Sequence, residues 1–198
     1  MNAQPTHHHL FDTAIGECGV AWNPRGLVGV QLPEKDRGQT ELRLAVKCRS
    51  TNAADVPPWV QSLISDIQRY LAGQPVDFSD VTVDLDGIDD FRKTLYAALR
   101  GVGVGRTVTY GELAKELGLT GWEGARDVGE AMGKNPMPVV IPCHRVLAAG
   151  NKPGGFSAYG GTTTKKKLLA LEGVVLDKPE KSAKPDKAKQ DTPRLPGL

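Results

Sequence analysis

Cys143 and His144 stand side by side, directly after the apolar run of residues 139–141. We expect this run to be a buried, strand-like segment, with Pro142 stiffening the backbone where the chain emerges. A thiol becomes a nucleophile when a neighbouring base or cation raises its thiolate fraction. The pair therefore fits nucleophilic catalysis, although the dipeptide alone is more typical of a buried structural cysteine.

The longer string around this pair, residues 135–146 (NPMPVVIPCHRV), resembles the active-site signature of the O6-alkylguanine-DNA alkyltransferases. The resemblance spans about residues 87–173 and includes YGELA, ARDVG, GFS, GG and LLALEG, which begin at Tyr110, Ala125, Gly155, Gly160 and Leu168. Before about residue 85 it rests on general layout. This family transfers an alkyl group from O6 of guanine in double-stranded DNA to a cysteine, so it implies single-turnover DNA repair without a cofactor.

The resemblance assigns the reacting groups. Cys143 is the alkyl acceptor, His144 is a base that acts through a water, and Glu172 orients and polarises the imidazole. Tyr110 donates a hydrogen bond to the guanine as it leaves with negative charge. Without the family context, sequence distance favours Glu172 as an exposed charge at a helix end, and Tyr110 fits a core residue at a helix entrance about equally well.

Three further residues complete the predicted pocket. Asn135 matches an asparagine that supports the active-site turn through hydrogen bonds, which is also what a turn or cap residue does. Ser157 and Phe156 line the pocket and hold the edge of the guanine. Phe156 stands where the family often has tyrosine, and residues 101–106 replace a loop that usually contains a Pro-Tyr pair.

DNA contacts are predicted on the helix that contains Arg126. A protein thiol cannot reach an atom stacked inside a duplex, so the nucleotide must rotate out of the stack. The resemblance makes Arg126 the arginine finger that fills the gap, whereas most helical arginines contact phosphates or solvent. Small residues Ala125 and Gly129 would let the backbone approach a groove, and Arg145 is a further expected DNA contact. Asp127 departs from the family's small apolar residue and would weaken DNA binding.

The elements that must position these residues fall into two groups. In the first, short segments separated by Gly and Asn-Pro predict an antiparallel meander, followed by two helices and a further strand; these are residues 11–15, 19–22, 27–32, 39–46, 59–71 and 76–85. The resemblance implies a ribonuclease-H-like α/β fold without catalytic residues for this domain, residues 1–86.

The second group, residues 87–173, reads as helical. Residues 89–100 carry one apolar face, and residues 111–117 and 125–132 form two helices around a glycine-containing turn, with Thr109 as an N-cap. A last helix covers residues 165–171. This is a helix-turn-helix pattern, which alone is a weak sign of DNA binding; the resemblance implies a winged-helix-like module that enters the minor groove.

Charge and composition agree with a DNA-binding protein inside the cell. The chain has 198 residues, 39% hydrophobic, with a net charge of +2. Residues 1–86 contain 7 basic and 11 acidic side chains, residues 87–173 contain 12 and 8, and residues 174–198 contain 6 and 4. The positive charge thus gathers with the motif, where it favours a polyanion, and residues 174–198 should be a disordered basic tail.

Three widely spaced cysteines and no apolar stretch long enough to span a bilayer favour a reducing compartment, cytoplasmic or, in a eukaryote, nuclear. We also expect a monomer. His7, His8 and His9 precede Cys18 and Cys48 without a zinc spacing, so we expect a mobile terminus and packing cysteines, and no metal. The rival functions are a non-catalytic or regulatory protein that binds alkylated DNA, and a Cys-His hydrolase.

Overall fold

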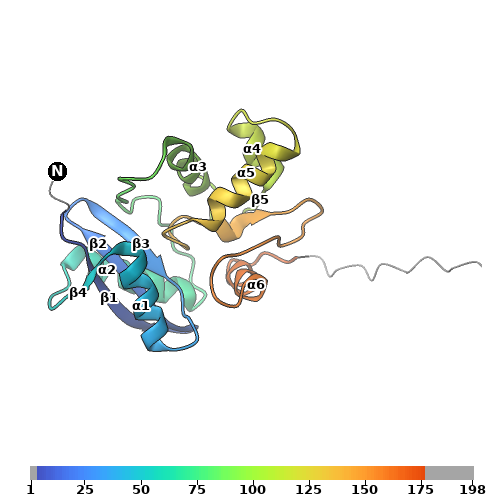
Figure 1. Ribbon diagram of the computed structural model, residues 1–198. Helices are drawn as coiled ribbons and strands as arrows, with labels where there is room; N and C mark the ends of the chain where they lie inside the picture. Colours follow the sequence, from blue (N-terminus) through green and yellow to red (C-terminus); the bar gives the residue numbers. More distant parts are fainter. Residues whose placement is uncertain (1–3, 177–198) are drawn as a thin grey trace, which may run out of the picture.

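The computed structural model describes residues 4–176, and its N-terminal half is a small sheet with a helix against each face (Figure 1). The strands stand in the order β3-β2-β1-β4; the first three form the predicted antiparallel meander, and β4 pairs with β1 in parallel. Their bounds are β1 His7–Thr13, β2 Gly16–Asn23, β3 Gly26–Gln31 and β4 Thr51–Asn52.

Strand β1 begins earlier than predicted, and it includes the three histidines. His7 pairs with Trp22 of β2, and the His8 ring is 3% exposed and within 3.0 Å of the Ser50 hydroxyl. The expectation of a mobile terminus is therefore wrong, because backbone pairing on both sides of β1 fixes these residues. Residues 4–176 hold no cluster of three or more His, Cys, Asp or Glu side chains suited to a metal ion.

Helices α1 (Arg37–Cys48) and α2 (Pro58–Leu71) cover opposite faces of the sheet. Neighbouring residues of a strand point to opposite faces, so Leu10 packs with Leu44 of α1 while Phe11 joins the cluster on the α2 side. The Asp36 carboxylate caps α1, and α2 opens with a proline at its first turn, where the missing N–H has no intrahelical partner.

The strand predicted at residues 76–85 does not form. The segment is irregular, with a turn in which the Asp77 carboxylate accepts from the backbone N–H of Ser79. It runs along the outer side of β3, where Leu27 donates to the Thr82 carbonyl and accepts from the Asp84 N–H. Aspartates that bond to nearby backbone compete with a continuous ladder, which explains the difference.

The C-terminal half is mainly helical, as predicted. Thr109 and Glu112 form a capping box at the start of α4. Helix α5 begins four residues before the predicted start, because Gly124 continues the helix where α4 and α5 approach closely; a Cβ atom there would lie 2.7 Å from Leu119 Cβ. The elements are α3 Asp90–Arg100, β5 Val108–Thr109, α4 Tyr110–Glu116, α5 Gly121–Gly133, a 3₁₀ turn Cys143–Arg145, β6 Val146–Leu147 and α6 Thr162–Leu171.

The two halves share one hydrophobic core, and α2 is the element that joins them by packing against α6. A second junction lies at the edge of the sheet, where the Val30 N–H of β3 donates to the Pro136 carbonyl over 3.0 Å. Lys47 of α1 donates to the carbonyls of Asn135 and Pro136, at 3.3 and 3.2 Å. The N-terminal domain thus touches the turn that leads to Cys143.

Among residues 4–176, no helix has both the length and the apolar character that crossing a bilayer demands. The predicted tail lies outside the described residues except for residues 174–176.

Candidate active site

A buried turn presents Cys143, and the Asn135 side chain closes it. The Asn135 amide donates to the Ile141 carbonyl over 2.8 Å and to the Cys143 Sγ over 3.0 Å, and its oxygen accepts from the Met137 N–H at 2.9 Å. Residues 139–141 are buried as predicted but form a turn instead of a strand, with Val139 at φ 78°. A β-branched residue is strained in this region, and the bonds to Asn135 hold the turn in place.

The Cys143 thiol is 6% exposed and rests in its neutral form. Burial raises the pKa of Cys143, against the opposing effects of the Asn135 hydrogen bond and of the Lys165 and Lys47 ammonium groups. A thiol with a raised pKa needs a base to remove its proton at the moment of reaction. The geometry therefore calls for the base that the neighbouring histidine provides.

His144 is fully buried and paired with Glu172, whose Oε1 atom lies 2.8 Å from the histidine Nε2. Burial pushes the pKa of Glu172 upwards, but hydrogen bonds from His144, Arg145 and Tyr70 outweigh it and hold that pKa well below its usual range. An ionised carboxylate only accepts hydrogen bonds, so Nε2 carries the imidazole proton. The Nδ1 atom is buried without a protein partner and keeps its lone pair.

Tyr70 completes this cluster from the other domain. Its hydroxyl donates to Glu172 Oε1 over 2.7 Å and lies 3.0 Å from His144 Nε2. Sequence reasoning missed this residue and treated the N-terminal domain as free of active-site groups. The one signal was a tyrosine on the otherwise aliphatic buried stripe of α2, since a buried hydroxyl must find a partner.

Arg145 belongs to the same cluster, and the prediction that it contacts DNA is wrong. The residue is 5% exposed, and its guanidinium donates to both carboxylate oxygens of Glu172 and to the Val102 carbonyl. The 3₁₀ turn that follows Pro142 buries this side chain inside the protein. Arg145 neutralises the buried carboxylate instead of a phosphate.

Lys165 is a second buried cation near the thiol that the sequence did not single out. Its ammonium donates to the carbonyls of Val146 and Gly155, at 2.5 and 3.2 Å, and lies 5.7 Å from the centre of the Tyr110 ring. Burial lowers the pKa of Lys165 to about 8. Nothing in the run of three lysines at 165–167 distinguishes the first from its exposed neighbours.

A pocket of about 230 Å³ opens at Cys143, and it brings together most of the predicted substrate-binding residues. Burial, with Cys143 nearby, raises the pKa of the Tyr110 hydroxyl, which therefore stays protonated. Gly154, at φ 65°, lies so close to the Tyr110 ring that a Cβ atom would be 3.0 Å away. The pocket is lined by Tyr110, Gly129, Met132, Gly133, Cys143, Gly155, Phe156 and Ser157.

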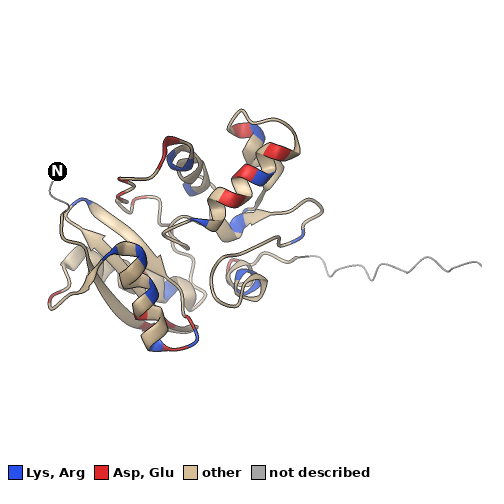
Figure 2. Ribbon diagram, in the orientation of Figure 1, with Lys and Arg blue, Asp and Glu red and all other residues tan. Residues whose placement is uncertain are grey.

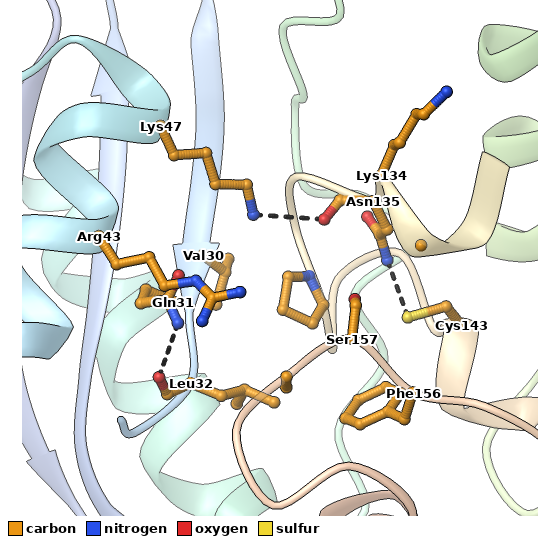
Figure 3. A pocket seen from close by; sticks show the side chains of 13 residues that line it. Val30, Gln31, Leu32, Arg43, Lys47, Lys134, Asn135, Cys143, Phe156 and Ser157 are labelled. Atoms are coloured by element: carbon orange, nitrogen blue, oxygen red, sulfur yellow. Dashed lines mark hydrogen bonds between the residues drawn. The ribbon is translucent and has the colours of Figure 1, made fainter. Parts of the chain in front are cut away.

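A smaller hollow of about 130 Å³ reaches Cys143 from the junction between the domains (Figure 3). Arg43 and Lys47 extend into it from α1, and Ser157 and Phe156 form part of its other wall. Cys143 therefore lies on the wall of two hollows, one within the C-terminal domain and one between the domains.

Three of the predicted DNA contacts lie on α5, where Arg126 is exposed while Ala125 and Gly129 are half-buried. Arg126 stacks on the Trp122 ring, 5.2 Å from its centre, and lies 3.7 Å from the Asp127 carboxylate. Trp122 is 70% exposed, and Gly129 follows one turn after Arg126 at the mouth of the pocket. Acidic residues alternate with Arg126 on this helix (Figure 2), so α5 itself is not a basic surface.

Comparison with known proteins places this site in a family. Residues 6–85 match the 6-O-methylguanine DNA methyltransferase ribonuclease-like domain, and residues 90–174 match the DNA binding domain of the same family. The chain belongs to the 6-O-methylguanine DNA methyltransferase family. The predicted order of an N-terminal α/β domain and a DNA-binding domain is therefore confirmed.

Relatives and solved structures of this family match both domains. The methylated-DNA–protein-cysteine methyltransferase of Methanothermobacter thermautotrophicus is 31% identical over 86% of this chain and 84% of its own. A Thermus thermophilus protein named a DNA base-flipping protein is 40% identical over 82% of this chain and 97% of its own. The crystal structure of Mycobacterium tuberculosis OGT in complex with DNA superimposes with a TM-score of 0.67 at 32% identity, covering 84% and 92% of the two chains.

Proposed function

We propose that this protein repairs DNA by transferring an alkyl group, typically methyl, from O6 of guanine to Cys143 in a single turnover. The observation that carries the proposal is the position of Cys143. Its sulfur lies on the wall of a base-sized pocket and accepts a hydrogen bond from the Asn135 amide. The next residue in the chain is a histidine whose Nδ1 lone pair is free. The relatives named as cysteine methyltransferases support the same reaction.

The transfer is a displacement at carbon. The Cys143 proton passes to His144 Nδ1, directly or through a water, and the sulfur forms a bond to the alkyl carbon as the bond from that carbon to O6 breaks. The Glu172 carboxylate stabilises the positive charge of the imidazolium that forms, and Arg145 balances the negative charge of Glu172. The guanine takes the electron pair and is stabilised by a hydrogen bond from Tyr110. The product is a thioether, and the mechanism requires no cofactor.

For access to the base, we assign α4 and α5 as a helix-turn-helix and the bridge between Ala148 and Lys152 as part of a wing, which makes this domain winged-helix-like. Arg126 would enter the base stack as the guanine rotates into the pocket, and Ala125 and Gly129 allow close approach of α5 to the minor groove. Ser157 and Phe156 hold the base edge, and the protein acts as a monomer.

The test is mass spectrometry of the intact protein and of its peptides after incubation with duplex DNA containing O6-methylguanine. We expect one added methyl group on Cys143 and none in Cys143→Ala, which should still bind the lesion. The alternative, a non-catalytic protein that binds alkylated DNA, predicts lesion binding by both proteins without any modified peptide. That second result would overturn the proposal.

A further inference from the structure

We propose that Tyr70 of the N-terminal domain is a positioning residue for alkyl transfer, because it fixes the ring orientation and the proton position of His144. The inference rests on the proposed function and extends it to a domain to which no active-site residue had been assigned. Tyr70 lies in the last turn of α2, the helix that packs against α6 of the catalytic domain. The N-terminal domain therefore contributes a side chain to the active site.

The three side chains form a closed triangle. Tyr70 Oη lies 2.7 Å from Glu172 Oε1 and 3.0 Å from His144 Nε2, and Nε2 lies 2.8 Å from the same Oε1 atom. The carboxylate accepts only, so the single tyrosine proton points to Oε1 and the tyrosine lone pair faces the Nε2 proton. Only one arrangement of protons satisfies all three edges.

This arrangement has a chemical consequence for the opposite nitrogen. With its proton held on Nε2 by two acceptors, the imidazole presents an unprotonated Nδ1, which is the atom without a protein partner. Burial and the negative Glu172 raise the pKa of Tyr70, so the hydroxyl keeps its proton across the working pH range. Burial lowers the pKa of His144, and the nearby cations Arg145 and Lys165 lower it further, against the opposing effect of Glu172.

Packing alone does not require a tyrosine here. The ring meets Phe78 edge-on, with 5.6 Å between the ring centres, and is surrounded by the buried stripe of α2, all of which a phenylalanine would satisfy equally. A buried hydroxyl is destabilising unless it forms hydrogen bonds, and the Tyr70 hydroxyl forms them with His144 and Glu172, which we call the relay.

The test compares Tyr70→Phe with Tyr96→Phe. Tyr96 is an equally buried tyrosine, but its hydroxyl donates to the Ala131 carbonyl, at 3.1 Å, instead of the relay. The rate of alkyl transfer is measured with free O6-benzylguanine and with O6-methylguanine duplex. Removing a group that positions a catalytic base should slow both reactions by about tenfold or more in Tyr70→Phe and by less than about threefold in Tyr96→Phe. Lesion binding, measured with Cys143→Ala added to each variant, should be unchanged.

Nitrogen NMR of histidine-labelled protein provides a readout that a merely structural role would not move. We expect His144 to show one protonated and one unprotonated nitrogen in the wild type and in Tyr96→Phe, and averaged or exchanged signals in Tyr70→Phe. Unchanged His144 signals, or rates that fall equally in both variants, would overturn the inference. A wild-type protein that never becomes alkylated would instead disprove the proposed function.

Discussion

The side-chain amide of Asn135 donates to the sulfur of Cys143 over 3.0 Å while also donating to the Ile141 carbonyl. One residue thus shapes the turn and stabilises negative charge on the nucleophile. Aspartate keeps the size of asparagine and the acceptor for the Met137 N–H, but it loses the donors both to the sulfur and to the Ile141 carbonyl, so the pKa of the thiol is the readout that reports on the bond to sulfur.

Replacing Asn135 with aspartate should raise the pKa of Cys143 further and slow alkyl transfer by about 100-fold, since a donor to the reacting atom becomes a negative charge. The pKa of the thiol is measured from the pH dependence of its reaction with a small alkylating agent. An Asn135→Asp protein whose thiol titrates as in the wild type would show that the bond to sulfur has no chemical role.

Arg145→Met should destabilise the fold and leave intrinsic DNA affinity intact. The substitution strands the buried Glu172 carboxylate, whose side chain is 1% exposed, without its cation. Breaking such a buried pair costs about 3 kcal/mol or more of unfolding free energy. Urea denaturation measures this loss, and the exposed pair of Arg69 and Asp66 provides the control, because Arg69→Met should cost less than about 1 kcal/mol.

If Arg145 contacted phosphates, Arg145→Met would instead weaken DNA binding at every sequence and reduce its salt dependence. Binding to a fluorescent duplex at several salt concentrations, under conditions where the variant is folded, separates the two outcomes.

Lys165 should make stability depend on pH in the alkaline range. Its pKa in the folded protein is about 8, below its ordinary value of 10.5, so between these values the unfolded chain binds more protons. The free energy of unfolding therefore gains a contribution from Lys165 that increases as the pH rises through this window and is absent below it, by about 3 kcal/mol in total.

The measurement is the difference in unfolding free energy between wild type and Lys165→Met at about pH 7.5, 9 and 10, which start just below the folded pKa and approach the unfolded one. The wild type should gain relative to the variant as the pH rises. A constant difference would mean that the ammonium is solvated in the folded state.

Arg126→Ala should impair repair of duplex DNA much more than reaction with free O6-benzylguanine. The side chain is exposed on α5 and lies outside the lining of the pocket, so it is placed to act on the duplex and not on the chemistry. Single-turnover rates on both substrates test this, with an expected loss of about tenfold or more on duplex only. Equal losses on both substrates would assign Arg126 to the pocket itself.

Local sequence pattern predicted the residues close to Cys143, and the family resemblance added the distant Tyr110 and Glu172. Cys143, His144 and Asn135 lie within one short segment, and their positions follow from that segment. Tyr70 bonds to residues 74 and 102 positions away, and its spacing on α2 is that of an ordinary core residue. Such contacts depend on how the two domains dock, which local patterns do not encode.

The errors in the elements have local causes. Residues 139–141 have strand-forming side chains, but the Asn135 amide donates to the Ile141 carbonyl in place of a neighbouring strand, and the chain turns back. Residues 76–85 alternate as a strand does, yet their aspartates bond to nearby backbone. In both cases a polar side chain outcompeted the apolar pattern.

The hydrogen bond from Val30 to Pro136 also matters for how the chain is made. Strand β3 is an edge of the sheet, and edges with unpaired backbone groups recruit strands of other molecules. During synthesis, the N-terminal domain emerges long before residue 136. Residues 82–84 already cover this edge at Leu27, but until Pro136 is made the part at Val30 is uncovered, so we expect the catalytic domain, through the carbonyl that precedes its own active-site turn, to protect the nascent protein from aggregation.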